Sequence, residues 1–252
     1  MSGRVLLRRL LFPPRCAYCG VLLDGIERKE PRALCKSCLV GWDTHKNALC
    51  DCCGGPVSEC EKSLSVMARH GVYTLLKLVQ YDPQKPNEIA NRVIFKLKDQ
   101  DSAELQAFLA AELVPAIQRQ LTMLGQTPEN TVLVWAPRSQ KALRECGFDQ
   151  SRGICNALAR ELGIKKPVRM VRRTGGGVQK MLGKEQRAQN AFAAFEAIPG
   201  YCANLQGKCV ILVDDVVTTG ATLSAVAAKI RPYKPAHVIA ACIAVDLPPE
   251  RR

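Results

Sequence analysis

Aromatic side chains are scarce in this chain of 252 residues, where Phe, Trp and Tyr together make up 5%. Proteins that bind single strands without sequence preference stack bases on aromatic rings, and no such platform is visible. No apolar run approaches the roughly 18 residues of a transmembrane helix. The leucines near the start are interrupted by Arg8 and Arg9, with no small-residue cleavage site after them. The lack of a membrane segment and of a secretory signal predicts a cytoplasmic protein.

Acidic residues are outnumbered, with 23 Asp or Glu against 36 Lys or Arg, which gives a formal net charge of +13. The excess is concentrated in residues 138–190, where thirteen Lys or Arg and four Asp or Glu leave a net charge of +9. A polyphosphate ligand, a nucleic acid or both would suit this field. The length allows one substantial α/β domain and a small appendage.

Apolar periodicity predicts a mostly parallel sheet covered by helices on both faces, since apolar strands alternate with amphipathic helices. The expected strands are residues 71–81, 131–136, 168–171, 209–213 and 237–245, and the expected helices are 87–97, 102–121, 151–162 and 223–230. The pattern begins near Gly71. We therefore expect a Cys-rich module in residues 1–70 and an α/β domain in residues 71–252.

A loop for a sugar phosphate is indicated by VILVDDVVTTGATL, residues 210–223. In a parallel sheet, the turn after a buried strand is where ligands bind. The adjacent Asp214 and Asp215 can accept hydrogen bonds from vicinal hydroxyls. Small and hydroxyl residues follow, and with the helix N-terminus they suit a phosphate: Val216, Val217, Thr218, Thr219, Gly220, Ala221 and Thr222.

Two simpler interpretations of this loop carry less weight. The first is that the acids only cap a helix, but two acids, two threonines and a glycine directly after a buried strand argue against that. The second is a standard nucleotide motif, but the segment is neither a Walker loop, because it lacks Gly-Lys-Ser/Thr, nor a GxGxxG fingerprint.

Eight of the thirteen cysteines fall in the first quarter of the chain, and in a reducing compartment such a cluster is typical of a metal site. Two CxxC pairs have the spacing of a tetrahedral zinc ribbon: Cys16, Cys19, Cys35 and Cys38. A second set, Cys50, Cys53 and Cys60, lacks its fourth ligand. Ser63 is a poor ligand, and the alternatives are Cys52, His45, His70, loss of the site, or sharing between the sets. The five remaining cysteines are interpreted as small buried hydrophobes: Cys146, Cys155, Cys202, Cys209 and Cys242.

Residues 214–222 resemble the phosphoribosyl pyrophosphate motif of type I phosphoribosyltransferases. The cysteine cluster, PRSQKALRECGFDQ (137–150) and QKMLGKEQRAQNAF (179–192) further resemble the ComF branch. This resemblance implies a type I phosphoribosyltransferase fold with an amino-terminal zinc-ribbon-like module, structural Zn²⁺, and phosphoribosyl pyrophosphate bound with Mg²⁺. The bacterial members are associated with DNA uptake during competence, which implies single-stranded DNA and a DNA-uptake protein as partners.

The resemblance also assigns roles to residues. Asp214 and Asp215 would hold the ribose as the catalytic acids, and the loop that follows would hold the 5-phosphate. The pyrophosphate would lie against Arg138, Ser139 and Lys141, while Lys184 and Arg187 would close over it from behind the glycine run 175–177.

Where the family has Arg-Gly-Phe-Asn-Gln, this chain has Cys146 and Asp149 in place of Arg and Asn. The substitution either weakens pyrophosphate binding or makes Asp149 a helix cap. Two functions remain open at this stage. One is a phosphoribosyltransferase whose acceptor the sequence does not identify. The other is a non-catalytic protein that senses the ligand or handles single-stranded DNA.

Overall fold

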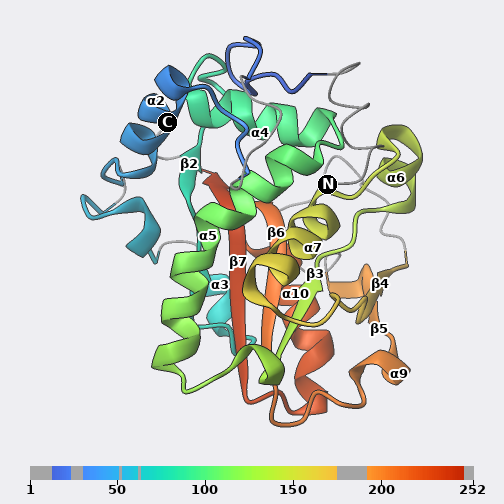
Figure 1. Cartoon of the computed structure of the whole chain (residues 1–252). Helices are drawn as coiled ribbons and strands as arrows, with labels where there is room; N and C mark the ends of the chain where they lie inside the picture. Colours follow the sequence, from blue (N-terminus) through green and yellow to red (C-terminus); the bar gives the residue numbers. More distant parts are fainter. Residues whose placement is uncertain (1–12, 24–30, 51–52, 62–63, 175–191, 247–252) are drawn as a thin grey trace.

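The computed structural model describes residues 13–23, 31–50, 53–61, 64–174 and 192–246. Its centre is a parallel sheet in which β6 (Cys209–Val217) lies between β3 (Thr131–Trp135) and β7 (His237–Asp246). The far edge of β7 pairs in succession with β1 (Leu75–Leu76) and β2 (Val79–Tyr81). All of these pairings are parallel, as the apolar strands predict, so their carboxyl ends share one edge (Figure 1).

Helices cover both faces of this sheet. Successive side chains of each strand point to opposite sides, and since the strands are largely apolar, both faces must be buried. Cys209, Ile211 and Val213 of β6 face one core, which also contains residues of α4 (Ile89–Asp99), α5 (Ala103–Met123) and α7 (Gln150–Leu162). Val210 and Leu212 face the other core, formed with α3 (Leu64–Ala68) and α10 (Ala221–Ile230).

The remaining elements are short, and several differ from expectation. They are α2 (Lys36–Lys46), α6 (Gln140–Cys146), α9 (Pro199–Cys202), β4 (Val171–Arg173), β5 (Phe195–Ala197), and 3₁₀ turns at Val57–Glu59, Pro128–Asn130 and Arg231–Tyr233. The strand expected at 168–171 is instead β4, which pairs antiparallel with β5 outside the main sheet. β6 extends beyond residue 213, so both acids lie within the strand, and Asp214 pairs with Cys242 of β7.

The amino-terminal module packs into the same core as the sheet. Trp42 of α2 is fully buried, and its ring lies 6.0 Å from that of Phe108 on α5, centroid to centroid. The indole Nε1 donates to Glu112 at 3.2 Å, and Lys46 Nζ reaches the same carboxylate oxygen at 2.5 Å. The apolar sequence that the module lacks for a core of its own is therefore supplied by α4 and α5. No helix in the described ranges has both the length and the apolarity to cross a bilayer.

Candidate ribose phosphate site and cysteine clusters

Strand register brings the two motifs of the site together at the carboxyl edge of the sheet. Trp135 of β3 pairs with Val213 of β6, and the Ala136 N–H donates to the Val213 carbonyl at 3.0 Å. The residues that follow in each strand are therefore neighbours. The charges of Arg138 and Asp215 both act on Asp149, so the Arg138 loop lies near the two acids.

The hydroxyl of Ser151 donates to Asp214 Oδ1 at 2.9 Å, and the Asp215 N–H donates to the same oxygen at 3.0 Å. Burial raises the pKa of Asp214 well above its ordinary value, and the charge of Asp215 raises it further. Two carboxylates held this close are costly without a partner, so the pair is ready to accept donors from a ligand.

Beyond Asp215, the chain forms an open turn into α10. Thr218 and Thr219 are exposed, and Gly220 takes φ +76°, a left-handed conformation that favours glycine. Gly220 is also the N-cap residue, so no side chain caps the helix from that position. The Thr219 hydroxyl accepts only a long hydrogen bond of 3.4 Å from the Ala221 N–H. The turn therefore presents backbone N–H groups and hydroxyls to an anion.

Asp149 acts as a helix cap, which was one of the two interpretations of its substitution. Its Oδ1 accepts from the Arg152 N–H at 3.2 Å at the start of α7, and its Oδ2 accepts from the Arg138 N–H at 3.2 Å. Burial raises the pKa of Asp149, the two N–H donors and the Arg138 charge oppose that rise, and the Asp215 charge adds to it. Asp149 therefore fixes the Arg138 loop beside the acids. A weakening of pyrophosphate binding stays a prediction.

The Arg138 guanidinium has an unmet requirement. Its Nη1 is buried and has no hydrogen-bond partner in the described part of the chain. A buried polar nitrogen without a partner is costly, and an anionic ligand would supply one.

The other residues expected to hold pyrophosphate have different placements. Ser139 caps α6, because its Oγ accepts from the Ala142 N–H at 3.1 Å. Lys141 is 86% exposed and lies 3.8 Å from Glu145, so it faces solvent. Lys184 and Arg187 lie outside the described residues, as do glycines 175–177.

Two residues of this site were not anticipated. Ser151 orients Asp214, as described above, and the Arg152 guanidinium carbon lies 5.8 Å from the centroid of the Trp135 ring at the end of β3. Both residues follow directly after the GFDQ segment in the sequence, and this adjacency is the feature that could have identified them as site residues.

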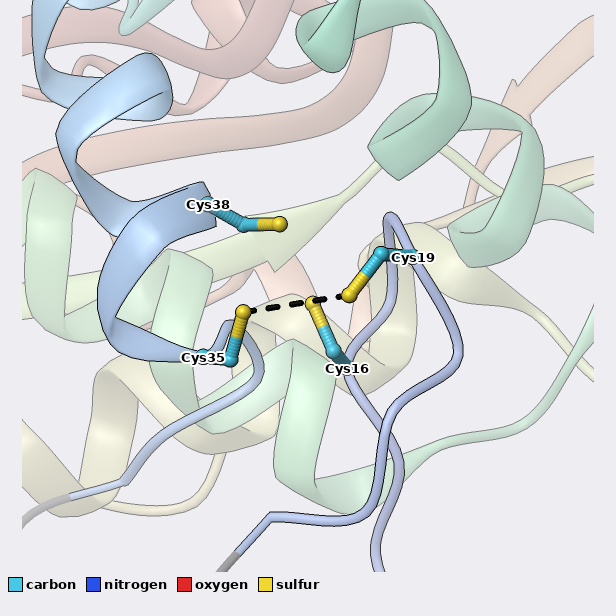
Figure 2. Close-up of side chains that lie close together, drawn as sticks. All are labelled: Cys16, Cys19, Cys35 and Cys38. Atoms are coloured by element: carbon cyan, nitrogen blue, oxygen red, sulfur yellow. Dashed lines mark hydrogen bonds between the residues drawn. The ribbon is translucent and has the colours of Figure 1, made fainter.

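The first cysteine cluster is assembled from two segments (Figure 2). Cys16 and Cys19 lie on a turn in which the Gly20 N–H donates to the Cys16 carbonyl at 2.9 Å, while Cys35 and Cys38 begin α2. The four Sγ atoms all lie within 4.8 Å of one another. A hydrogen bond with the Ser37 hydroxyl is the main cause that lowers the pKa of Cys35 to about 6. Four converging thiols, one of them readily ionised, fit tetrahedral zinc.

The second cluster repeats the first turn with one ligand fewer. The Gly54 N–H donates to the Cys50 carbonyl at 2.8 Å, and the Sγ atoms of Cys50, Cys53 and Cys60 lie within 4.8 Å of one another. The groups are separate, so the described residues do not support ligand sharing. His45 contacts the Gln80 carbonyl at 3.4 Å, and the ring of His70 lies 4.6 Å from that of Phe192, centroid to centroid. Cys52 and Ser63 lie outside the described residues.

Four of the five scattered cysteines are buried, as expected: Cys155, Cys202, Cys209 and Cys242. The expectation was wrong for Cys146, which is exposed at the end of α6. The left-handed Gly147 that follows it turns the chain away from the core before α7 begins.

Comparison with known families finds two matches along the chain. A phosphoribosyl transferase domain matches residues 150–251, which include both acids and the phosphate loop. A double zinc ribbon domain matches residues 7–67, which include both cysteine clusters. Together with those clusters, this match indicates structural zinc.

The individual proteins that resemble this chain do so at low sequence identity. DNA utilization protein YhgH of Escherichia coli (strain K12) is 29% identical over 77% of this chain and 82% of its own length. The Shigella flexneri protein of the same name is 28% identical over the same shares. A solved structure from Thermus thermophilus, that of TT1426, aligns with 57% of this chain and 84% of its own at 17% identity, with a TM-score of 0.32, too low to bear on the fold.

Proposed function

We propose that this chain, a ComF-like protein that joins a double zinc ribbon domain to a phosphoribosyl transferase domain, binds phosphoribosyl pyrophosphate at the carboxyl edge of its sheet. The ribose hydroxyls would donate to Asp214 and Asp215. The 5-phosphate would lie in residues 218–222, against the N-terminus of α10. The pyrophosphate would lie toward Arg138.

The observation that carries this proposal is the unpartnered Arg138 Nη1, in a loop that Asp149 holds near the two adjacent carboxylates. A lone phosphate would satisfy the loop but not the acids, and a neutral sugar would leave the guanidinium unpaired. A ligand with hydroxyls in the middle and phosphates at both ends satisfies all three groups. Carboxylate oxygens also suit Mg²⁺, which would arrive with the pyrophosphate and offset part of its charge.

If transfer occurs, the protein's contribution is electrostatic and positional. Asp214 and Asp215 would fix the ribose and stabilise positive charge as it develops at the anomeric carbon. Arg138 would stabilise the departing pyrophosphate, which carries away the bonding electron pair as the acceptor's bond to that carbon forms. Ser151 would hold Asp214 in position through its hydroxyl.

Calorimetric titration with phosphoribosyl pyrophosphate and Mg²⁺ tests the binding proposal. We expect it to bind more tightly than ribose 5-phosphate, and Arg138→Met to reduce that preference by about tenfold, which corresponds to roughly 1.4 kcal/mol. Lys141→Met is the matched control, because that side chain is already exposed and paired with Glu145. Absence of binding to the wild-type chain would reject the proposal.

The relatives are named DNA utilization proteins, and this name favours a second candidate, a role in handling DNA, for which we propose single strands. Fluorescence anisotropy with a labelled oligonucleotide separates it from the first. DNA handling predicts affinity that falls steeply with salt and survives Asp215→Asn. A transferase instead predicts pyrophosphate release with an acceptor base, and loss of that release in Asp215→Asn.

A further inference from the structure

A cavity lies at the opposite end of the sheet from the ribose phosphate site. It has a volume of about 440 Å³ and opens where β7 begins, between the segment that leads into β1 and the turn before β7. Its lining includes Tyr73, Arg231, Lys234 and His237, with apolar walls from Leu124 and Pro235. We refer to it as the Arg231 cavity. A volume of this size is typical of small-molecule sites.

Positive charge at the Arg231 cavity has no counter-charge among the described residues that line it. None of the described residues that line it is acidic, and no ion pair in the described ranges involves Arg231 or Lys234. The charges of Arg231 and Arg69 also act on nearby His70, where they add to burial in lowering its pKa. Cations gathered without an anion repel one another, and an anionic ligand relieves that repulsion.

The backbone holds Arg231 in place over Gly71. A methyl group added at Gly71 would lie 1.6 Å from Arg231 Nη1, so the guanidinium packs directly against this glycine. Lys234 takes φ +55°, the left-handed conformation that a lysine seldom adopts. Lys234 is thus displayed by an unusual backbone conformation, and Arg231 extends from the end of α10 onto Gly71.

An aromatic ring completes the cavity. Tyr73 is 72% exposed although it lies next to buried Val72. In a chain with few aromatic residues, an exposed tyrosine that lines the same cavity as two cations offers a face on which a base can stack.

We propose that the Arg231 cavity binds a nucleotide unit, with its phosphate on Arg231 and Lys234 and its base against Tyr73. The unit is either a free nucleotide or one residue of a single strand. This inference does not rest on the ribose phosphate proposal, because the two sites occupy opposite ends of the strands.

The test titrates adenosine 5′-monophosphate, adenosine and a short oligodeoxyadenylate into the full chain carrying Thr219→Glu. That acid repels phosphate from the loop of the first site. We expect the monophosphate to bind, and adenosine to bind at least about tenfold more weakly, because it lacks the phosphate. Tighter binding of the oligonucleotide would identify a strand as the source, and tighter binding of the monophosphate would identify a free nucleotide.

Variants assign the binding to this cavity. Lys234→Asn removes the charge and suits the left-handed backbone, and Arg231→Met removes the other cation. Gly71→Ala keeps every charge, displaces the guanidinium and also strains the backbone, because Gly71 has φ +78°. Each should weaken binding by about tenfold, whereas Arg160→Met, an equal loss of charge on exposed α7 surface, should not. The proposal is overturned if no probe binds, if binding disappears with Thr219→Glu alone, or if the Arg160 variant loses as much.

Discussion

Asp214→Asn is expected to stabilise the ligand-free protein and, at the same time, to weaken phosphoribosyl pyrophosphate binding by about 100-fold, or roughly 2.7 kcal/mol. Asparagine keeps an Oδ1 that accepts from Ser151 and from the Asp215 N–H. It removes the buried charge, whose cost is evident in the raised pKa of Asp214. Asp214 therefore lowers the stability of the folded, ligand-free protein, as expected of a residue whose role is to bind a ligand.

The pH dependence distinguishes this explanation from simple repacking. Folding raises the pKa of Asp214, so its ionisation costs stability above the unfolded-state pKa, and that cost is complete above the folded pKa. The advantage of Asp214→Asn in melting temperature should therefore be largest at high pH and shrink as pH falls. An advantage that does not change with pH would contradict the assignment. Ser151→Ala serves as the matched variant, because it removes one donor while both acids remain.

Cys35→Ser is expected to release one equivalent of zinc and to unfold the amino-terminal module. Structural zinc contributes roughly 10–16 kcal/mol in small modules, which is comparable to the total stability of most domains. Serine is a good N-cap residue, and Cys35 occupies that position of α2, so the variant isolates the loss of the metal ligand. Metal content and thermal unfolding measure both effects.

Cys146→Ser is the control for the zinc experiment, because that thiol is exposed and belongs to neither cluster. It should keep the zinc content and the melting temperature of the wild-type chain. Since Trp42 shares the main core, we expect the melting temperature of the whole chain to fall in Cys35→Ser. Unchanged zinc content in that variant would refute the assignment of the first cluster.

The main sheet could be predicted because its strands are apolar along their whole length. Residues 209–213 and 239–245 are buried on both faces, and such continuous apolar runs indicate central parallel strands without tertiary information. β4 was misplaced because Val168 precedes Met170 and Val171 in one short apolar run. Its antiparallel partner, β5, is more than twenty residues away in sequence, so the register depends on a contact that no local pattern contains. α6 escaped prediction because none of its residues is buried.

Residues of the site could be predicted where they form a continuous motif in the sequence. Residues that join the site only through the packing of distant segments could not. The acids, the phosphate loop and the paired cysteines are each local motifs. Ser151 became part of the site only because α7 crosses the end of β6. Likewise, the missing partner of Arg138 is visible only once neighbouring segments have been shown to leave it unpaired.

The contact between Trp42 and Glu112 can form only after both the amino-terminal module and α5 have been synthesised. The two residues are 70 positions apart. The amino-terminal module therefore leaves the ribosome well before α5, the helix that covers the Trp42 indole. Zinc can bind its first four thiols during that interval, yet the apolar side of the module stays uncovered until α5 has been made. We therefore expect the nascent chain to be prone to aggregation in this window, since apolar surface is exposed until α5 is available to cover it.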